Sequence, residues 1–210
     1  MPKRILIRRV AALVVFATAT QAHADAWYVF AGVGPSYTED INGSVGGTPL
    51  RESYGTGFMV HGGSGYEAGP YRLEGEIIYA EHPPEGVTLG DIQSSSAGDR
   101  SALAGLANFY FDFDTRTRWV PYAGAGIGAA HIALNNIVAS PSLSLDESDV
   151  VFAFQLKAGV AYSLSRSTRI SVGYRFFGAD EPKLGDVDGL AVKTEASHLH
   201  TLEAQVRYRF

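Results

Sequence analysis

The 210-residue sequence predicts an all-β fold, an eight-stranded antiparallel up-and-down transmembrane β-barrel. Three observations lead to this prediction. Residues 198–210 alternate strictly between apolar and polar side chains, and eight extended segments are joined by connections that are alternately short and long. After the first 24 residues, no stretch offers the roughly 18 continuous apolar residues of a membrane helix. A barrel with lipid outside and a polar lumen inside accounts for all three.

The first 24 residues have the three parts of a secretory signal peptide. A basic start precedes an apolar run over residues 10–19, and Ala22-His23-Ala24 has the form of a cleavage site. The run is too short for a convincing membrane span, which makes an uncleaved anchor the less favoured alternative. We therefore expect residues 1–24 to be removed on export and residues 25–210 to form one barrel domain.

Removal of that segment takes away four basic and no acidic residues, so the formal net charge changes from −5 to −9. The remaining chain is long enough for one substantial domain, and no linker divides it. The chain has no cysteine. An exported domain of this size then needs a source of stability other than disulfides, such as closure of a sheet.

The eight extended segments are expected at residues 26–36, 57–66, 71–81, 101–113, 119–132, 150–164, 168–178 and 198–210. The second, fourth and sixth are followed by short connections, at residues 67–70, 114–118 and 165–167. The other connections are long and rich in Gly, Ser, Pro, Asp and Asn. This alternation is typical of a barrel with periplasmic turns and external loops, and an even strand count brings both termini to the turn side.

Period-two alternation assigns the faces of five segments, because side chains two apart in a strand share a face. The segments at 26–36, 57–66 and 119–132 are too rich in Gly and Ala for such an assignment. The predicted outward apolar residues are Tyr71, Leu73, Ile77 and Tyr79; Leu103, Ala107, Phe109 and Phe111; Phe152, Phe154, Leu156 and Val160; Ile170, Val172, Tyr174 and Phe176; and Leu202, Ala204, Val206, Tyr208 and Phe210.

Aromatic residues gather at the ends of the segments, where their amphipathic rings would occupy two membrane interfaces. On the turn side these are Trp27, Tyr66, Tyr71, Phe113, Trp119, Tyr162 and Phe210, and on the loop side Tyr37, Tyr54 and Tyr79.

The predicted lumen face carries a set of charged residues: Arg72, Glu74, Glu76, Lys157, Arg169, Arg175, Glu203, Arg207 and Arg209. The interior of an eight-stranded barrel is just wide enough for side chains to fill it. Unpaired charges there would be very costly, so we expect Glu74, Glu76 and Glu203 to pair with inward Arg and Lys side chains. The alternative is a gated pore in which these pairs open and close.

Five motifs occur in order along the chain: residues 72–79, 108–113, 119–128, 154–162 and 172–176. Together they resemble the eight-stranded outer-membrane β-barrel proteins related to the opacity-type surface antigens and to the OmpA membrane domain. The resemblance covers the chain after residue 24 except for its loops. No segment after Phe210 resembles the peptidoglycan-binding domain of full OmpA-type proteins, so no anchoring role toward the cell wall is implied.

The resemblance implies a location in the cell outer membrane, in contact with outer-membrane lipid and lipopolysaccharide. The final strand also resembles the carboxy-terminal signal that the barrel assembly machinery reads during insertion. The residues that would carry this assembly signal are Leu202, Tyr208 and Phe210.

Candidates for catalysis or metal binding are few. His198 and His200 share one face near the loop-side rim, and such a pair can hold a metal, but the sequence specifies no further ligand and an exposed pair is favoured. Ser101 with His200 is a conceivable lipid-hydrolysing pair, without a nucleophile elbow to support it. We therefore expect no catalysis, cofactor or metal, and no motif indicates nucleic acid binding. The remaining histidines of the barrel are isolated: His61, His82 and His131.

Most acidic residues lie in the long connections or at the strand ends beside them. A solvated, repulsive surface explains this simply. The alternatives are binding of divalent cations shared with lipopolysaccharide phosphates, or recognition of a basic partner. Asp186-Val187-Asp188-Gly189 resembles part of a calcium loop without its full spacing.

These observations predict a non-catalytic, monomeric outer-membrane surface protein, with a structural role in the envelope or with loops that mediate adhesion and contact with a host or surface partner. The alternative function is a narrow, porin-like passive pore for small solutes or ions. A third class, a soluble periplasmic barrel with an apolar ligand, requires the opposite polarity. In that case Leu202, Val206, Tyr208 and Phe210 would point inward.

Overall fold

The computed structural model describes residues 27–39, 41–45, 47–89, 92–94, 99–140, 143–181, 186–187, 190–194 and 196–210. The predicted signal peptide lies outside these residues. Within them, no helix is long and apolar enough to cross a membrane.

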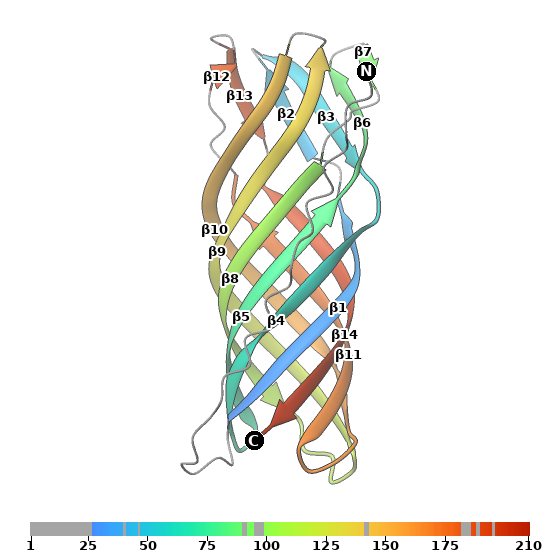
Figure 1. Cartoon of the computed structure of the whole chain (residues 1–210), viewed down its shortest axis with the longest axis vertical. Helices are drawn as coiled ribbons and strands as arrows, with labels where there is room; N and C mark the ends of the chain where they lie inside the picture. Colours follow the sequence, from blue (N-terminus) through green and yellow to red (C-terminus); the bar gives the residue numbers. More distant parts are fainter. Residues whose placement is uncertain are drawn as a thin grey trace, which may run out of the picture.

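Eight strands close into one antiparallel barrel, which confirms the predicted fold class (Figure 1). The order around the wall is β1, β14, β11, β10, β9, β8, β5, β4, and the pairing of β1 with β14 closes the barrel. Closure leaves no exposed sheet edge within the wall. The strands are β1 (Trp27–Thr38), β4 (Gly57–Ala68), β5 (Tyr71–His82), β8 (Asp99–Asp112), β9 (Trp119–Ser140), β10 (Leu143–Ser163), β11 (Thr168–Ala179) and β14 (Ser197–Arg209).

The predicted short turns lie together at the lower end of the barrel in Figure 1, the turn side, where the chain also ends. The β4–β5 turn has only Gly69 and Pro70 between the paired residues Ala68 and Tyr71. Gly69 has a φ of 59°. Proline is restricted to negative φ, so the left-handed position of this tight hairpin falls on the glycine.

The hairpin of β9 and β10 is longer than predicted. Residues 133–149 were expected to form a long loop, but β9 continues to Ser140 and β10 begins at Leu143. The two strands remain paired from Ile132 and Asp149 up to Ser140 and Leu143, with register shifts near residues 143–147. Beyond the membrane a strand no longer needs one apolar and one polar face, so backbone pairing can continue where the period-two contrast is lost.

The other three long connections also contain strands. They are β2 (Ile41–Val45), β3 (Thr48–Tyr54), β6 (Pro84–Leu89), β7 (Ile92–Ser94), β12 (Asp186–Val187) and β13 (Leu190–Thr194). They form a second sheet with the order β12, β13, β2, β3, β6, β7 at the loop side, the upper end in Figure 1. Pairing of β13 with β2 and of β3 with β6 therefore joins three connections that are distant in sequence.

The outward faces predicted from alternation are confirmed. Ile77 is 65% exposed and Leu202 is 66% exposed, whereas their inward neighbours Glu76, Ile78, Thr201 and Glu203 are buried. These apolar side chains on the outer wall are suited to lipid and not to water. The opposite polarity required for a soluble barrel with an apolar ligand is absent from the described wall.

The Gly-rich strands, whose faces the sequence left open, place many of their glycines inward. A Cβ added to Gly126 of β9 would lie 1.8 Å from Oδ1 of Asn108, and one added to Gly32 of β1 would lie 2.3 Å from Nε2 of His61. Glycine at these positions makes room for large polar side chains from neighbouring strands. These strands thus form part of the site described next.

Candidate functional site

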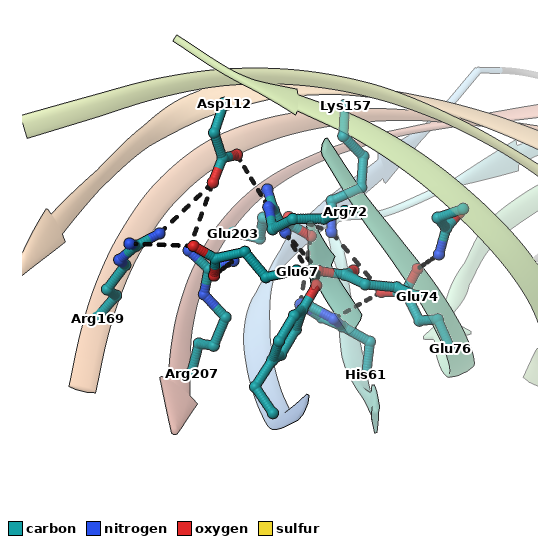
Figure 2. A network of polar contacts seen from close by, with 12 residues as sticks. His61, Glu67, Arg72, Glu74, Glu76, Asp112, Lys157, Arg169, Glu203 and Arg207 are labelled. Atoms are coloured by element: carbon teal, nitrogen blue, oxygen red, sulfur yellow. Dashed lines mark hydrogen bonds and ion pairs between the residues drawn. The ribbon is translucent and has the colours of Figure 1, made fainter. Parts of the chain in front are cut away.

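The inward side chains fill the barrel lumen in three layers, which can be followed along β5 from the turn side upward. Arg72 and Glu74 belong to a lower cluster, Glu76 to a central network, and Ile78 to an apolar layer nearer the loops. Figure 2 shows most of the charged side chains of the two polar layers. The lower cluster comprises Tyr28, Glu67, Arg72, Glu74, Asp112, Arg169 and Arg207, and the central network comprises His61, Glu76, Asn108, Gln155, Lys157, Arg175 and Glu203.

Arg175 joins the two carboxylates of the central network. Its Nη2 atom lies 2.6 Å from Oε1 of Glu76, and its Nε atom donates to Oε2 of Glu203 at 2.8 Å. Lys157 adds a second cation, with Nζ 2.8 Å from Oε1 of Glu203. Charge-assisted hydrogen bonds of this kind are roughly twice as strong as neutral ones, and here they offset the cost of burying the charges.

Two amide side chains complete the hydrogen bonding of Glu76. Asn108 and Gln155 donate to its Oε2 atom at 2.9 Å and 2.6 Å. Gln155 also accepts from Nη1 of Arg175 at 2.7 Å, so the residues interlock across several strands. The completely buried Arg175 side chain therefore has a partner for each part of its guanidinium group.

His61 lies at the centre of this network, although the sequence suggested that it was isolated. Its Nδ1 atom is 2.8 Å from Glu76 and its Nε2 atom is 3.3 Å from Glu203, and its side chain is completely buried. The prediction was wrong because the neighbouring glycines obscured the alternation of β4. The inward neighbours of His61 are Met59 and Gly63, which carry no charge, so no signal in the sequence of β4 marked this face as the lumen side.

The lower cluster begins with Arg72. Its Nη1 atom lies 2.5 Å from Oε1 of Glu74, and its Nε atom donates to Asp112 at 2.9 Å. Tyr28 donates a second hydrogen bond to the same Glu74 oxygen at 2.7 Å. The guanidinium group of Arg72 also lies over the ring of Tyr110, 4.3 Å from its centroid.

Arg169 and Arg207 share two carboxylates at the turn-side end of the lumen. Arg169 lies 3.3 Å from Glu67 and 3.5 Å from Asp112, and Arg207 lies 3.8 Å and 3.7 Å from the same pair. The Arg169 side chain is 26% exposed. These looser pairs form the partly hydrated boundary of the cluster.

The nine charged residues predicted for the lumen differ in how deeply they lie within the two polar layers. Seven are buried in the two polar layers, namely Arg72, Glu74, Glu76, Lys157, Arg175, Glu203 and Arg207. Arg169 lies at their edge, and Arg209 is outside both layers, where Nη2 donates to the carbonyl oxygen of Arg166 in the β10–β11 turn. Glu67 and the neutral partners Tyr28 and Gln155 also belong to the site, although they were not among its predicted residues.

The apolar layer lies above the central network. It consists of Met59, Ile78, Ala80, Ala104, Leu106, Ala130, Ile132, Val151, Ala153, Phe177, Ala179 and Leu199. All are buried, although they line the inside of a barrel wall. The interior on the loop side is therefore packed like a protein core.

The conceivable Ser101–His200 pair is excluded by the topology. Ser101 is on β8 and His200 on β14, and these strands lie on opposite sides of the closed wall. His200 instead has its Nδ1 atom 2.5 Å from the hydroxyl of Tyr174 and its Nε2 atom 3.5 Å from Glu39. His198 lies 3.9 Å from the same carboxylate. Among the described residues, no group of side chains has the arrangement of a metal site.

The predicted assembly signal lies on the outer wall of β14 and just beyond it. Leu202, Tyr208 and Phe210 are 66%, 51% and 42% exposed. The predicted calcium-loop sequence cannot be placed in the same way, since Asp188 and Gly189 lie outside the described residues.

Comparison with known proteins identifies a family. Residues 10–210 match the model of the outer membrane protein beta-barrel domain. The chain is 30% identical over 135 residues to an uncharacterized protein of Brucella abortus, a match that covers 52% of this chain and 48% of that protein. The chain thus spans about half the length of the curated relatives it matches.

Two solved structures share the fold. The crystal structure of Neisserial surface protein A has a TM-score of 0.56 at 19% identity, with 88% of this chain and 97% of that chain covered. The outer membrane protease OmpT from Escherichia coli has a TM-score of 0.57 at 7% identity, with 92% and 99% covered. One neighbour is a surface protein and the other a protease, so the fold alone does not assign the activity.

Proposed function

Because the chain belongs to the outer-membrane β-barrel family, we propose that it is a non-catalytic surface protein of the outer membrane whose barrel is closed to solutes. The barrel would stabilise the envelope and present the loop-side sheet to a host or surface partner. The observation that supports this proposal is the filled lumen. Two polar layers and one apolar layer occupy its cross-section in succession.

The apolar layer argues most directly against the alternative, a narrow passive pore. An ion that reached it would lose most of its hydration shell and meet mainly apolar side chains, although the hydroxyls of Ser36 and Thr201 lie beside Met59. Hydrophobic constrictions exclude water and ions. Loosening the charged pairs below would not remove this barrier. Conduction would require the packed side chains of the apolar layer to separate as well.

The loop-side sheet supports the second half of the proposal. Paired strands from three connections give this end a defined backbone, where long unstructured loops were expected. Binding residues are often carried by connecting segments held on a rigid scaffold. The barrel would provide that scaffold, while outer-membrane lipid and lipopolysaccharide surround its wall.

Single-channel recording in planar bilayers tests the proposal. The refolded protein is compared with Glu74→Gln and Glu203→Gln, which remove one carboxylate from each polar layer. We expect no discrete openings in any of the three. Openings whose conductance or lifetime changes with the substitutions would instead establish a gated pore. The pore would then be the favoured function and the closed surface protein the alternative.

A further inference from the structure

A small cavity lies inside the lumen between the walls formed by β5 and β8 and by β10, β11 and β14. Its volume is about 10 Å³. That is close to the space that one water molecule needs. Polar and apolar atoms both line it. The lining includes Arg72, Glu74 and Arg207 of the lower cluster, Lys157 of the central network, and Tyr110 and Gln205.

Four buried polar atoms of these lining residues have no hydrogen-bond partner within the described part of the chain. They are Oε2 of Glu74, the hydroxyl oxygen of Tyr110, Oε1 of Gln205 and Nη1 of Arg207. Glu74, Tyr110 and Arg207 are 4%, 2% and 6% exposed. Leaving a buried polar group unpaired costs about 1–3 kcal/mol, so four such atoms around one cavity require an explanation.

We propose that a single buried water occupies this cavity and hydrogen-bonds across the lumen, joining Glu74 on one wall to Gln205 on the other. The four atoms match the hydrogen-bonding capacity of water. Glu74 and Gln205 accept its two hydrogen atoms, while Arg207 and the Tyr110 hydroxyl donate to its oxygen. Buried waters typically make about three such bonds, and this site offers four.

An anion is the main competitor, because Arg72, Lys157, Arg169 and Arg207 all line the cavity. Their charges are already used, however. Arg72 is paired with Glu74 and Asp112, and Lys157 with Glu203. An anion would also leave Oε2 of Glu74 and Oε1 of Gln205 facing a negative charge without a proton between them. Water satisfies both acceptors, and a halide satisfies neither.

The bound water would make the lower half of the lumen a hydrated structure, in contrast to the apolar layer above. Its hydrogen bonds would join β14 to β5 and β8, two strands that already share the direct hydrogen bond between Arg72 and Asp112. Gln205 would then act by holding the water, a role that its position in the sequence did not indicate.

Crystals of the refolded barrel, soaked in bromide, test the site directly. We expect one water peak roughly 2.7–3.2 Å from the four atoms and no anomalous bromide signal there. A bromide peak would show an anion site and overturn the proposal. The proposal would also be overturned if the side chains of Gln205 and Arg207 occupied the cavity and hydrogen-bonded directly to each other.

Water relaxation dispersion in solution provides an independent readout. Gln205→Leu should lose one long-lived water relative to the wild type, whereas Gln205→Glu, which keeps an acceptor of the same length, should retain it. Heat-modifiable gel mobility shows whether each variant is folded. An unchanged number of long-lived waters in folded Gln205→Leu would refute the assignment.

Discussion

Glu76→Gln is the substitution that most severely tests the ion-pair account of the lumen. It keeps the size of the side chain and removes one buried negative charge. Arg175 at 2.6 Å, His61 at 2.8 Å and Lys157 at 3.7 Å all face the lost charge. Glu203 would then be the only carboxylate of the central network facing Arg175 and Lys157.

The expected loss in the free energy of unfolding for Glu76→Gln follows from the burial of its ion pair. The side chains of Glu76 and Arg175 are both 0% exposed. Breaking a buried pair by removing one partner costs about 3–5 kcal/mol, because the remaining charge is left uncompensated. Glu67→Gln is the matched control, since it removes the same charge from the rim. Glu67 and its partner Arg169 are 15% and 26% exposed. Partly exposed pairs contribute about 1 kcal/mol or less.

Urea unfolding in detergent micelles, followed by tryptophan fluorescence and by gel mobility, measures both losses in the free energy of unfolding. We expect the loss for Glu76→Gln to exceed that for Glu67→Gln by about 2 kcal/mol or more. In a double-mutant cycle, Arg175→Met should cost less in the Glu76→Gln background than in the wild type. Equal losses for the two glutamates would refute the assignment of a strong buried network.

Four further predictions concern other parts of the chain. Gly126→Val should prevent normal refolding because its side chain would overlap Asn108, whereas Gly105→Val, which points into open space, should leave gel mobility unchanged. Phe177→Ala should lower the free energy of unfolding by about 3–5 kcal/mol in the same urea titration, through the cavity it leaves in the apolar layer. Phe210→Ser should reduce the amount of assembled barrel in cells but not refolding of the purified chain; equal effects on both would argue against an assembly signal. Mass spectrometry of the exported protein should find cleavage after Ala24, and an intact amino terminus would indicate an uncleaved anchor.

The barrel strands were predictable because each has two environments that differ in polarity. Lipid outside and a filled polar interior impose a period of two, and β5 and β14 follow it throughout the predicted segments. Tight turns provided the boundaries, as at Gly69 and Pro70. The second sheet was not predictable in this way. Short strands exposed beyond the membrane have no comparable contrast between faces, and the Ser, Asp and Pro residues in them indicated loops.

The lumen residues can likewise be divided into those that the sequence could assign to the interior and those that it could not. Arg72, Glu74 and Glu76 could be assigned to the interior from alternation alone. His61 could not, because its inward neighbours Met59 and Gly63 show no contrast in polarity with the outward residues Val60 and Gly62. Asn108 lies between the outward residues Ala107 and Phe109, so alternation places it inward, but its hydrogen bond to Glu76 depends on the register of β5 against β8.

The sequence by itself determined that the chain forms antiparallel strands, which side chains of the alternating strands face the lumen, and that the lumen is charged. Only the tertiary structure decided which charges meet. Glu76 and Arg175 are separated by 99 positions in sequence and lie on strands that are not neighbours in the wall. Contacts across a lumen depend on strand order, tilt and register stagger around the closed barrel, and a period of two within one strand specifies none of them.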